Sequence, residues 1–238
     1  MSARFPLMEK PLIGFLLAFV AGSMDAFTFF SAKTFATVQS GNVVLSGYWL
    51  IQGAFEKFVF PIVSVLLFGF GSMFAGVIMT SRLSQGKLYT TRILLIEAAI
   101  LAVAGASFLA GHLDPRYIAF AVSFVGGMQG NAFHKSHGML YGNVAVTFVV
   151  QMAFNFLAQS FFKKTGINGE PNLQWSGLFF LVLLGFSGGA GIGALLVKQF
   201  GVAELLLPAA ILIGIAIASM RSKKEHEPTD PTQGGLIG

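Results

Sequence analysis

One acidic residue lies at a position where an acid is costly. Asp25 sits deep within the apolar run Leu12–Phe30. A carboxylate inside an apolar span is expensive to remove from water, so such residues usually bind a proton, a cation or a substrate. The alternative is that Asp25 accepts hydrogen bonds from a broken helix and only maintains its shape.

Two short polar motifs could bind a solute. Ser40-Gly41-Asn42 and Gly142-Asn143 each open an apolar run. Ser and Asn cap the free N–H groups of a helix start, Gly permits close approach, and a helix N-terminus attracts anions. We therefore expect two half-helices whose starts bind a small polar or anionic solute. The alternative is two well-capped helix starts without a ligand.

Several other classes of site are not expected. The chain has no cysteine, and no carboxylate or cysteine near His134 and His137 completes a metal-ligand set. The phosphate-binding motif G-x-x-x-x-G-K-[ST] is absent, as are a recognisable nucleophile and paired catalytic carboxylates. We expect neither an enzyme nor a cofactor or metal. The net charge of +5 is spread over short loops, which argues against nucleic acid as a partner.

The composition predicts the elements that must position these residues. The chain is 55% hydrophobic and only 11% charged, whereas soluble domains carry about a quarter charged residues. This predicts an all-α, polytopic membrane protein whose first partner is the lipid bilayer. Uninterrupted runs near the ~20 residues that cross a bilayer are Leu12–Phe30, Phe58–Met79, Ile93–Ala110, Leu178–Val197 and Val202–Met220.

Two longer regions, Leu12–Gly53 and Tyr117–Phe161, are each interrupted by polar residues. Helical hydrogen bonding is predicted to lapse between about residues 31 and 41 and again between about residues 134 and 142. Lys33, Lys135 and the two histidines of these stretches could be gate or proton-relay residues, or simply loop residues in water.

The two halves of the chain match in order at four places, offset by about 100 to 116 residues. This predicts a duplication with repeats at residues 1–112 and 113–220, followed by a disordered cytoplasmic tail at 221–238. It also predicts that Asp25 and Gln129 face each other. The matched segments are 22–27 with 126–133, 41–44 with 142–145, 69–70 with 185–186, and 98–101 with 209–212.

Charge decides how the repeats are expected to lie. If each interrupted region crosses the membrane once, each repeat has three crossings and the second repeat is inverted. Arg82, Lys87 and Arg92 then lie on the cytoplasmic side with both termini, as the positive-inside rule requires. If each region crosses twice, the repeats are parallel, with eight helices, and these cations fall outside. We favour the inverted arrangement, because it satisfies the positive-inside rule. Paired broken helices in two inverted halves also indicate where a transporter's substrate site would lie.

Two further expectations concern packing. Gly185, Gly189 and Gly193 give small-xxx-small spacings, which permit close helix packing within the chain or in a homodimer. Glu97 lies about one turn beyond Arg92 and is expected to reach the interface or to pair with that arginine.

At these motifs the chain resembles the YoaK family of uncharacterised bacterial membrane proteins. The resemblance rests on Gly22-Ser23-Met24-Asp25-Ala26, on Ser40-Gly41-Asn42, and on Gly127-Met128-Gln129 with Asn131-Ala132. The second half departs from the family pattern, because Gly130 is inserted and Tyr141-Gly142-Asn143 replaces a threonine-rich element. The resemblance implies a location in the bacterial cytoplasmic (inner) membrane and supplies no activity.

Together these features predict a secondary transporter or permease for a small polar or anionic solute, with coupling to a proton or cation as one option. Its site would lie at the membrane midplane between the repeats. The alternatives are a passive channel of the same fold, which never concentrates its solute, and a membrane scaffold that transports nothing. The residues expected to bind the solute are Asp25, Ser40, Gly41, Asn42, Gln129, Asn131, Gly142 and Asn143.

Overall fold

The fold is predominantly helical in the part of the chain that the structure describes. The computed structural model describes residues 7–80, 89–109, 111, 113–133, 135–136, 139–140, 144–166 and 169–221. The α-helices are α1 (Pro11–Ala32), α2 (Gln39–Ile51), α3 (Phe55–Thr80), α4 (Tyr89–Ala106), α5 (Pro115–Ala132), α6 (Val146–Phe162), α7 (Asn172–Phe200) and α8 (Leu206–Arg221). Short elements are η1 (Leu7–Glu9), η3 (Ser107–Leu109), η5 (Gly201–Leu205), β1 (Lys135–Ser136) and β2 (Met139–Leu140). The all-α prediction is confirmed.

Among the described residues, four helical segments are long and apolar enough to cross a membrane. They are Pro11–Ala32, Phe55–Thr80, Tyr89–Ala106 and Asn172–Arg221, the last of which contains both α7 and α8. Large apolar side chains such as Leu66, Val103 and Leu184 are more than half exposed. Because so much exposed apolar surface is unfavourable in water, its natural solvent is lipid, and the protein is a multi-pass membrane protein.

Both predicted interruptions are present. Helix α1 ends at Ala32 and α2 begins at Gln39, and α5 ends at Ala132 before α6 begins at Val146. The β1–β2 hairpin lies within the second interruption. Predictions for residues 81–88, His134, His137, Gly142, Asn143 and the tail beyond Arg221 lie outside the described residues.

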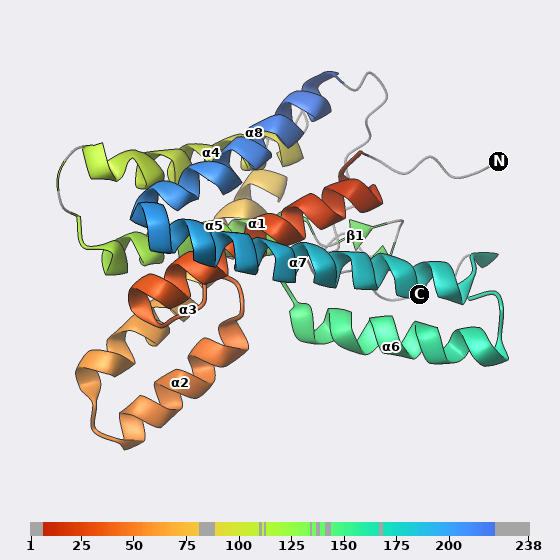
Figure 1. Cartoon of the computed structure of the whole chain (residues 1–238), viewed down its shortest axis with the longest axis horizontal. Coiled ribbons are helices and arrows are strands. Elements are labelled where there is room, and N and C mark those ends of the chain that lie inside the picture. The colour runs from red at the N-terminus through yellow and green to blue at the C-terminus, as the bar shows by residue number, and fades with distance from the viewer. Residues whose placement is uncertain are drawn as a thin grey trace.

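Glycine brings α1 and α7 into backbone contact, and Figure 1 shows these helices side by side. A Cβ on Gly22 would meet the carbonyl oxygen of Phe186, and one on Gly189 would meet that of Phe19. Gly185 and Gly193 also lie against α1. The small-xxx-small spacing therefore packs helices within the chain.

The same contact recurs between α3 and α5. A Cβ on Gly127 would meet the carbonyl oxygen of Phe68, and one on Gly71 would meet that of Phe124. The remaining packing follows the same plan, since α2 lies on α3 as α6 lies on α7, and α4 lies on α8. Each half therefore contributes two helices to these close contacts, α1 and α3 from the first half and α7 and α5 from the second.

This packing corrects the predicted register between the halves. Gly22 and Gly127 make equivalent contacts, so Asp25 corresponds to Gly130 and not to Gln129. The sequence comparison aligned Gly22 with the neighbouring glycine, Gly126. In α3, likewise, Gly71 makes the contact equivalent to that of Gly189, whereas Gly69 makes no such contact.

Helix directions follow from successive contacts along each interface. The residue numbers of contacting positions increase together along α1 and α7, and also along α3 and α5, so each of these pairs is parallel. Helices α4 and α8 are antiparallel. The contacts are Phe15 with Gly185 and Ser23 with Gly193 for α1–α7, Ser64 with Ser123 and Ser72 with Asn131 for α3–α5, and Thr91 with Ser219 and Leu206 with Gly105 for α4–α8.

Candidate functional site

Residues 33–38, which we call the re-entrant segment, turn back along α1. Lys33 adopts a left-handed conformation (φ 55°) and ends α1, its N–H donating to the carbonyl of Phe29. Four residues later, Thr37 donates from its backbone N–H to Asp25 Oδ1 and from its hydroxyl to Asp25 Oδ2, and each of these bonds is 2.7 Å long. Asp25 lies seven residues before the end of α1, or about 10 Å along its axis. The segment therefore descends by about two helical turns.

Irregular backbone of this segment is enclosed by protein. Thr34, Ala36 and Thr37 are buried, and the carbonyl of Ala36 lies against Gly126 of α5, where a Cβ would collide with it. Non-helical backbone at membrane depth is tolerated only when protein or a watery cavity surrounds it. Gly126 therefore makes room for the segment between α1 and α5.

Asn42 fastens the other end of the segment. Its Oδ1 accepts from the N–H of Phe35 (2.9 Å), and its Nδ2 donates to the carbonyl of Phe35 (2.7 Å). Its Nδ2 is also 2.8 Å from Gln39 Oε1 and 3.0 Å from Ser64 Oγ, and Ser64 contacts the hydroxyl of Ser123 at 2.8 Å. In this conformation the Asn42 amide is fully engaged in holding the segment.

The predicted cap at Ser40-Gly41-Asn42 is wrong, and the one at Gly142-Asn143 falls on residues outside the described part of the chain. The N-cap of α2 is Val38 and that of α6 is Ala145, and neither makes a side-chain cap. Gly41 instead lies against the ring of Phe35, while Ser40 is exposed. Within this motif it is Asn42 that binds the re-entrant segment, rather than the free N–H groups of the helix start.

The predicted site residues of the second half lie apart from Asp25. Gln129 donates from Nε2 to the carbonyl of Leu17, two helical turns before Asp25 on α1. Asn131 donates from Nδ2 to the carbonyl of Ser72 on α3. Asp25 and Asn42 are therefore connected only through the re-entrant segment, by way of Thr37 and Phe35, and neither Gln129 nor Asn131 bonds to Asp25 among the described contacts.

Sequence reasoning missed the hydroxyl groups that complete the site. Thr37 carries both hydrogen bonds to Asp25, and Ser64 and Ser123 link the Asn42 amide to α3 and α5. An available signal was a lone serine within an otherwise apolar span, because such a hydroxyl usually bonds across helices.

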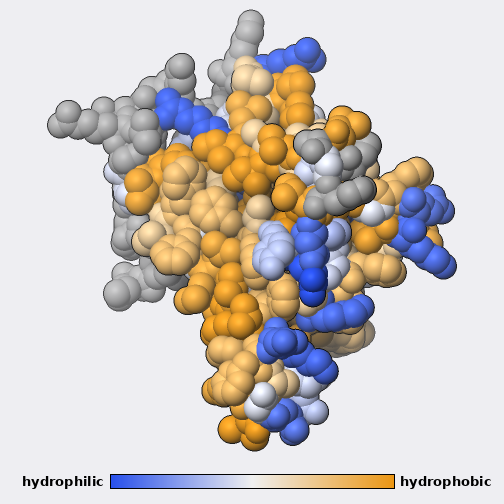
Figure 2. Space-filling model, turned by 90° about the vertical axis from the view of Figure 1, so that its left-hand side faces the viewer, coloured by the Kyte–Doolittle hydropathy of each residue, from blue (hydrophilic) through white to orange (hydrophobic). Residues whose placement is uncertain are grey.

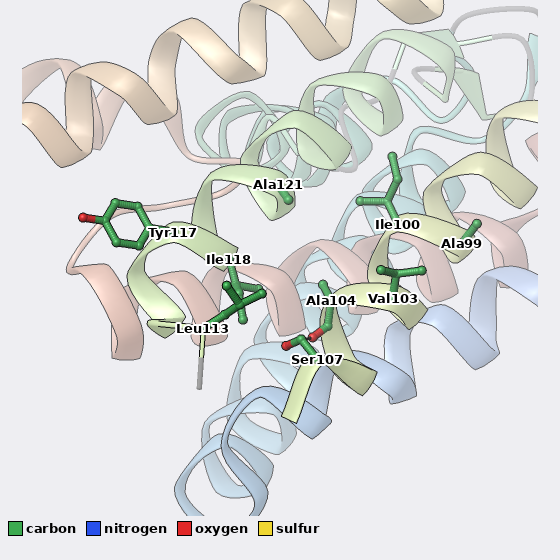
Figure 3. Close-up of a pocket in the computed structure, with 9 residues that line it drawn as sticks. All are labelled: Ala99, Ile100, Val103, Ala104, Ser107, Leu113, Tyr117, Ile118 and Ala121. Carbon is green, nitrogen blue, oxygen red and sulfur yellow. Dashed lines mark hydrogen bonds between the residues drawn. The ribbon is translucent and has the colours of Figure 1, made fainter. Parts of the chain in front are cut away.

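A hollow of about 500 Å³ lies between α4 and α5 (Figure 3). Hydroxyl groups from Ser107 and Tyr117 are the polar side-chain groups of its lining, which contains no charged residue. The other lining residues are Ala99, Ile100, Val103, Ala104, Leu113, Ile118 and Ala121. A wall of this kind offers nothing to neutralise an anion, so we place no anionic solute there.

Comparison with known families identifies the chain. A family model described as a protein of unknown function (DUF1275) matches residues 13–218. The chain belongs to this family. The match confirms the resemblance seen in the sequence, because the YoaK protein is a DUF1275 member. No curated protein and no solved structure matches the chain.

Two glutamates of this DUF1275 protein are buried, and Glu97 differs from expectation. Glu97 is fully buried, and neither carboxylate oxygen has a hydrogen-bond partner among the described residues, so it neither reaches the interface nor pairs with Arg92. Glu204 in η5 is also buried and accepts a hydrogen bond from the hydroxyl of Ser23. That bond joins α1 to the connection between α7 and α8.

Proposed function

We propose that this protein is a secondary transporter or permease for a small polar or anionic solute in the bacterial cytoplasmic membrane. The observation that carries the proposal is a buried, non-helical segment fastened to an intramembrane carboxylate between the two halves. Discontinuous helices placed in this way form the substrate sites of many secondary transporters. The re-entrant segment would act as the gate.

An inverted arrangement of the halves is part of the proposal. Gln129 of α5 contacts Leu17 of α1, whereas Gly126, one turn earlier on α5, lies against Ala36 and Thr37 of the segment that bonds to Asp25, farther along α1. The equivalent helices α1 and α5 therefore run in opposite directions, which supports inverted repeats and disfavours parallel ones. Each half would cross the membrane three times, with α2 and α6 as additional half-helices.

The turns α2–α3 and α6–α7 provide a matched test of topology. Because the chain has no cysteine, Gln52→Cys and Lys164→Cys each introduce a single thiol at an exposed position. An impermeant maleimide should label Gln52→Cys in intact cells, but Lys164→Cys only after permeabilisation. Gln85→Cys should behave like Lys164→Cys, as the charge distribution predicts. Labelling of both equivalent turns in intact cells would instead show parallel repeats.

Asp25 can couple a proton to the gate through Thr37. An ionised carboxylate accepts both hydrogen bonds from Thr37, and such charge-assisted bonds are roughly twice as strong as neutral ones. Addition of a proton replaces an acceptor with a donor, which weakens the attachment of the segment. Proton binding and release would thus alternate with opening and closing of the gate.

A scaffold without transport is the principal alternative, and one observation favours it: Asp25 and Asn42 are already hydrogen-bonded within the chain. To separate the alternatives, purified protein should be screened against metabolites by thermal shift, because a ligand stabilises the state that it binds. Hits are then tested for uptake into proteoliposomes under an imposed pH gradient. Accumulation above the external concentration indicates a transporter, flux only to equilibrium indicates a channel, and neither binding nor flux indicates a scaffold.

A further inference from the structure

Three cationic side chains gather around one hollow beside the end of α1. The hollow has a volume of about 380 Å³, and its lining includes Lys33, Lys57 and Arg116 together with a single acid, Glu56. The cations come from the end of α1, the first turn of α3 and the first turn of α5. Figure 2 views the molecule from this end, where hydrophilic side chains gather among hydrophobic ones.

Aromatic rings lie against each cation. Lys57 Nζ lies 4.5 Å from the centre of the Trp49 ring, and Lys33 Nζ lies 5.1 Å from that of Phe29. The guanidinium of Arg116 similarly lies 5.6 Å from the ring of Phe60. Cation–π contacts position a cation without neutralising it. The two lysines therefore keep their charge beside the hollow, whereas Arg116 is also paired with the carboxylate of Asp114.

The neighbouring acids do not balance these charges. Asp114, the N-cap of α5, receives a hydrogen bond from Arg116 Nε at 2.8 Å. Hydrogen bonding from Arg116 lowers the pKa of Asp114 below its ordinary value, so Asp114 stays ionised. With Glu56 also counted, two acids still face three cations. Because the three cations are exposed, water screens their mutual repulsion, but the net positive charge that remains beside the hollow attracts an anion.

We propose that this hollow binds the carboxylate or phosphate group of an organic anion. The cations would contact the anionic group, and Trp49 and Phe60 in the wall would contact its apolar part. The anion could be a soluble solute or the headgroup of an anionic lipid, because both present the same oxygen chemistry. Binding here does not require transport, although the hollow adjoins the first residue of the re-entrant segment.

The local charge can be measured with single cysteines. Ser31 lines the hollow, whereas Gln52 lies on the exposed α2–α3 turn outside it. Each cysteine is labelled with an anionic and a cationic methanethiosulfonate reagent of similar size. The ratio of the anionic to the cationic labelling rate should be about tenfold higher at Ser31→Cys than at Gln52→Cys. Adding Lys33→Gln and Lys57→Gln leaves Arg116 facing two acids, so the ratio should fall to the control value or below it, and Glu56→Gln should increase it. Equal ratios at the two positions would overturn the proposal.

Occupancy is tested by protection of Ser31→Cys at constant ionic strength. The soluble probes are inorganic phosphate and benzoate, with chloride as the control, in nanodiscs of phosphatidylcholine alone. The lipid probe is phosphatidylglycerol added to the same nanodiscs. Several-fold slower labelling with a soluble probe identifies a solute site, and slowing only with phosphatidylglycerol identifies a headgroup site. If neither slows labelling, the hollow binds no such anion and the proposal is wrong, whatever the outcome of the uptake assay.

Discussion

Asp25→Asn is expected to abolish solute accumulation in proteoliposomes while leaving the protein folded. The asparagine Oδ1 can still accept from the N–H of Thr37, and its Nδ2 can donate to the Thr37 hydroxyl, so the attachment of the re-entrant segment keeps its shape. The side chain can no longer gain or lose a proton. Uptake driven by a pH gradient should therefore fall to background.

Asp25→Ala is the matched comparison. It leaves the N–H and hydroxyl of Thr37 buried without their acceptor, at a cost of about 1–3 kcal/mol for each group. The alanine variant should therefore unfold at a lower temperature than both the wild type and Asp25→Asn. Normal accumulation by Asp25→Asn would refute the coupling role, and failure of Asp25→Asn to fold would favour a purely structural one.

Gly189→Val is expected to prevent recovery of folded, monodisperse protein. The new Cβ would fall against the backbone of Phe19 on α1, which cannot move aside as a flexible side chain can. Overpacking of a core usually costs about 1–3 kcal/mol, and contact with backbone places this substitution at or above the upper end of that range. Size-exclusion chromatography and thermal unfolding in detergent measure the loss.

Gly191→Val provides the control on the same helix. A Cβ at Gly191 has no atom within 4 Å among those described, so the substitution carries the propensity cost of valine without the collision. Gly71→Val should behave like Gly189→Val, because it meets the backbone of Phe124 at the equivalent contact. If Gly189→Val were as stable as Gly191→Val, the close packing of α1 on α7 would be wrong.

The helical class and both interruptions were predictable because lipid imposes a strong constraint on sequence. Unbroken apolar runs must be helical in a bilayer, and polar stretches such as 31–34 and 39–42 stand out against them. The costly position of Asp25 likewise pointed to the re-entrant segment, because few donors other than a broken helix are available at that depth.

Register and helix rotation were not predictable. Gly126 and Gly127 are adjacent, and only the contact of Gly127 with Phe68 shows which of them corresponds to Gly22. Helices that are apolar all round also give no periodic signal for the direction a residue faces. The burial of Glu97 could therefore not be inferred from its distance to Arg92.

The most direct test of the gating role is the accessibility of residue 34 from the two sides of the membrane. Thr34 lies within the re-entrant segment, is buried, and is close to cysteine in size. If the segment gates a solute path, a small impermeant thiol reagent should label Thr34→Cys slowly in intact cells and also in inside-out vesicles. A solute identified by the thermal-shift screen should change both rates. Gln52→Cys, labelled from one side only, reports the integrity of each preparation. A Thr34→Cys protein that remains unlabelled from both sides, even with Asp25→Asn, would show a permanently sealed segment and contradict transport through it.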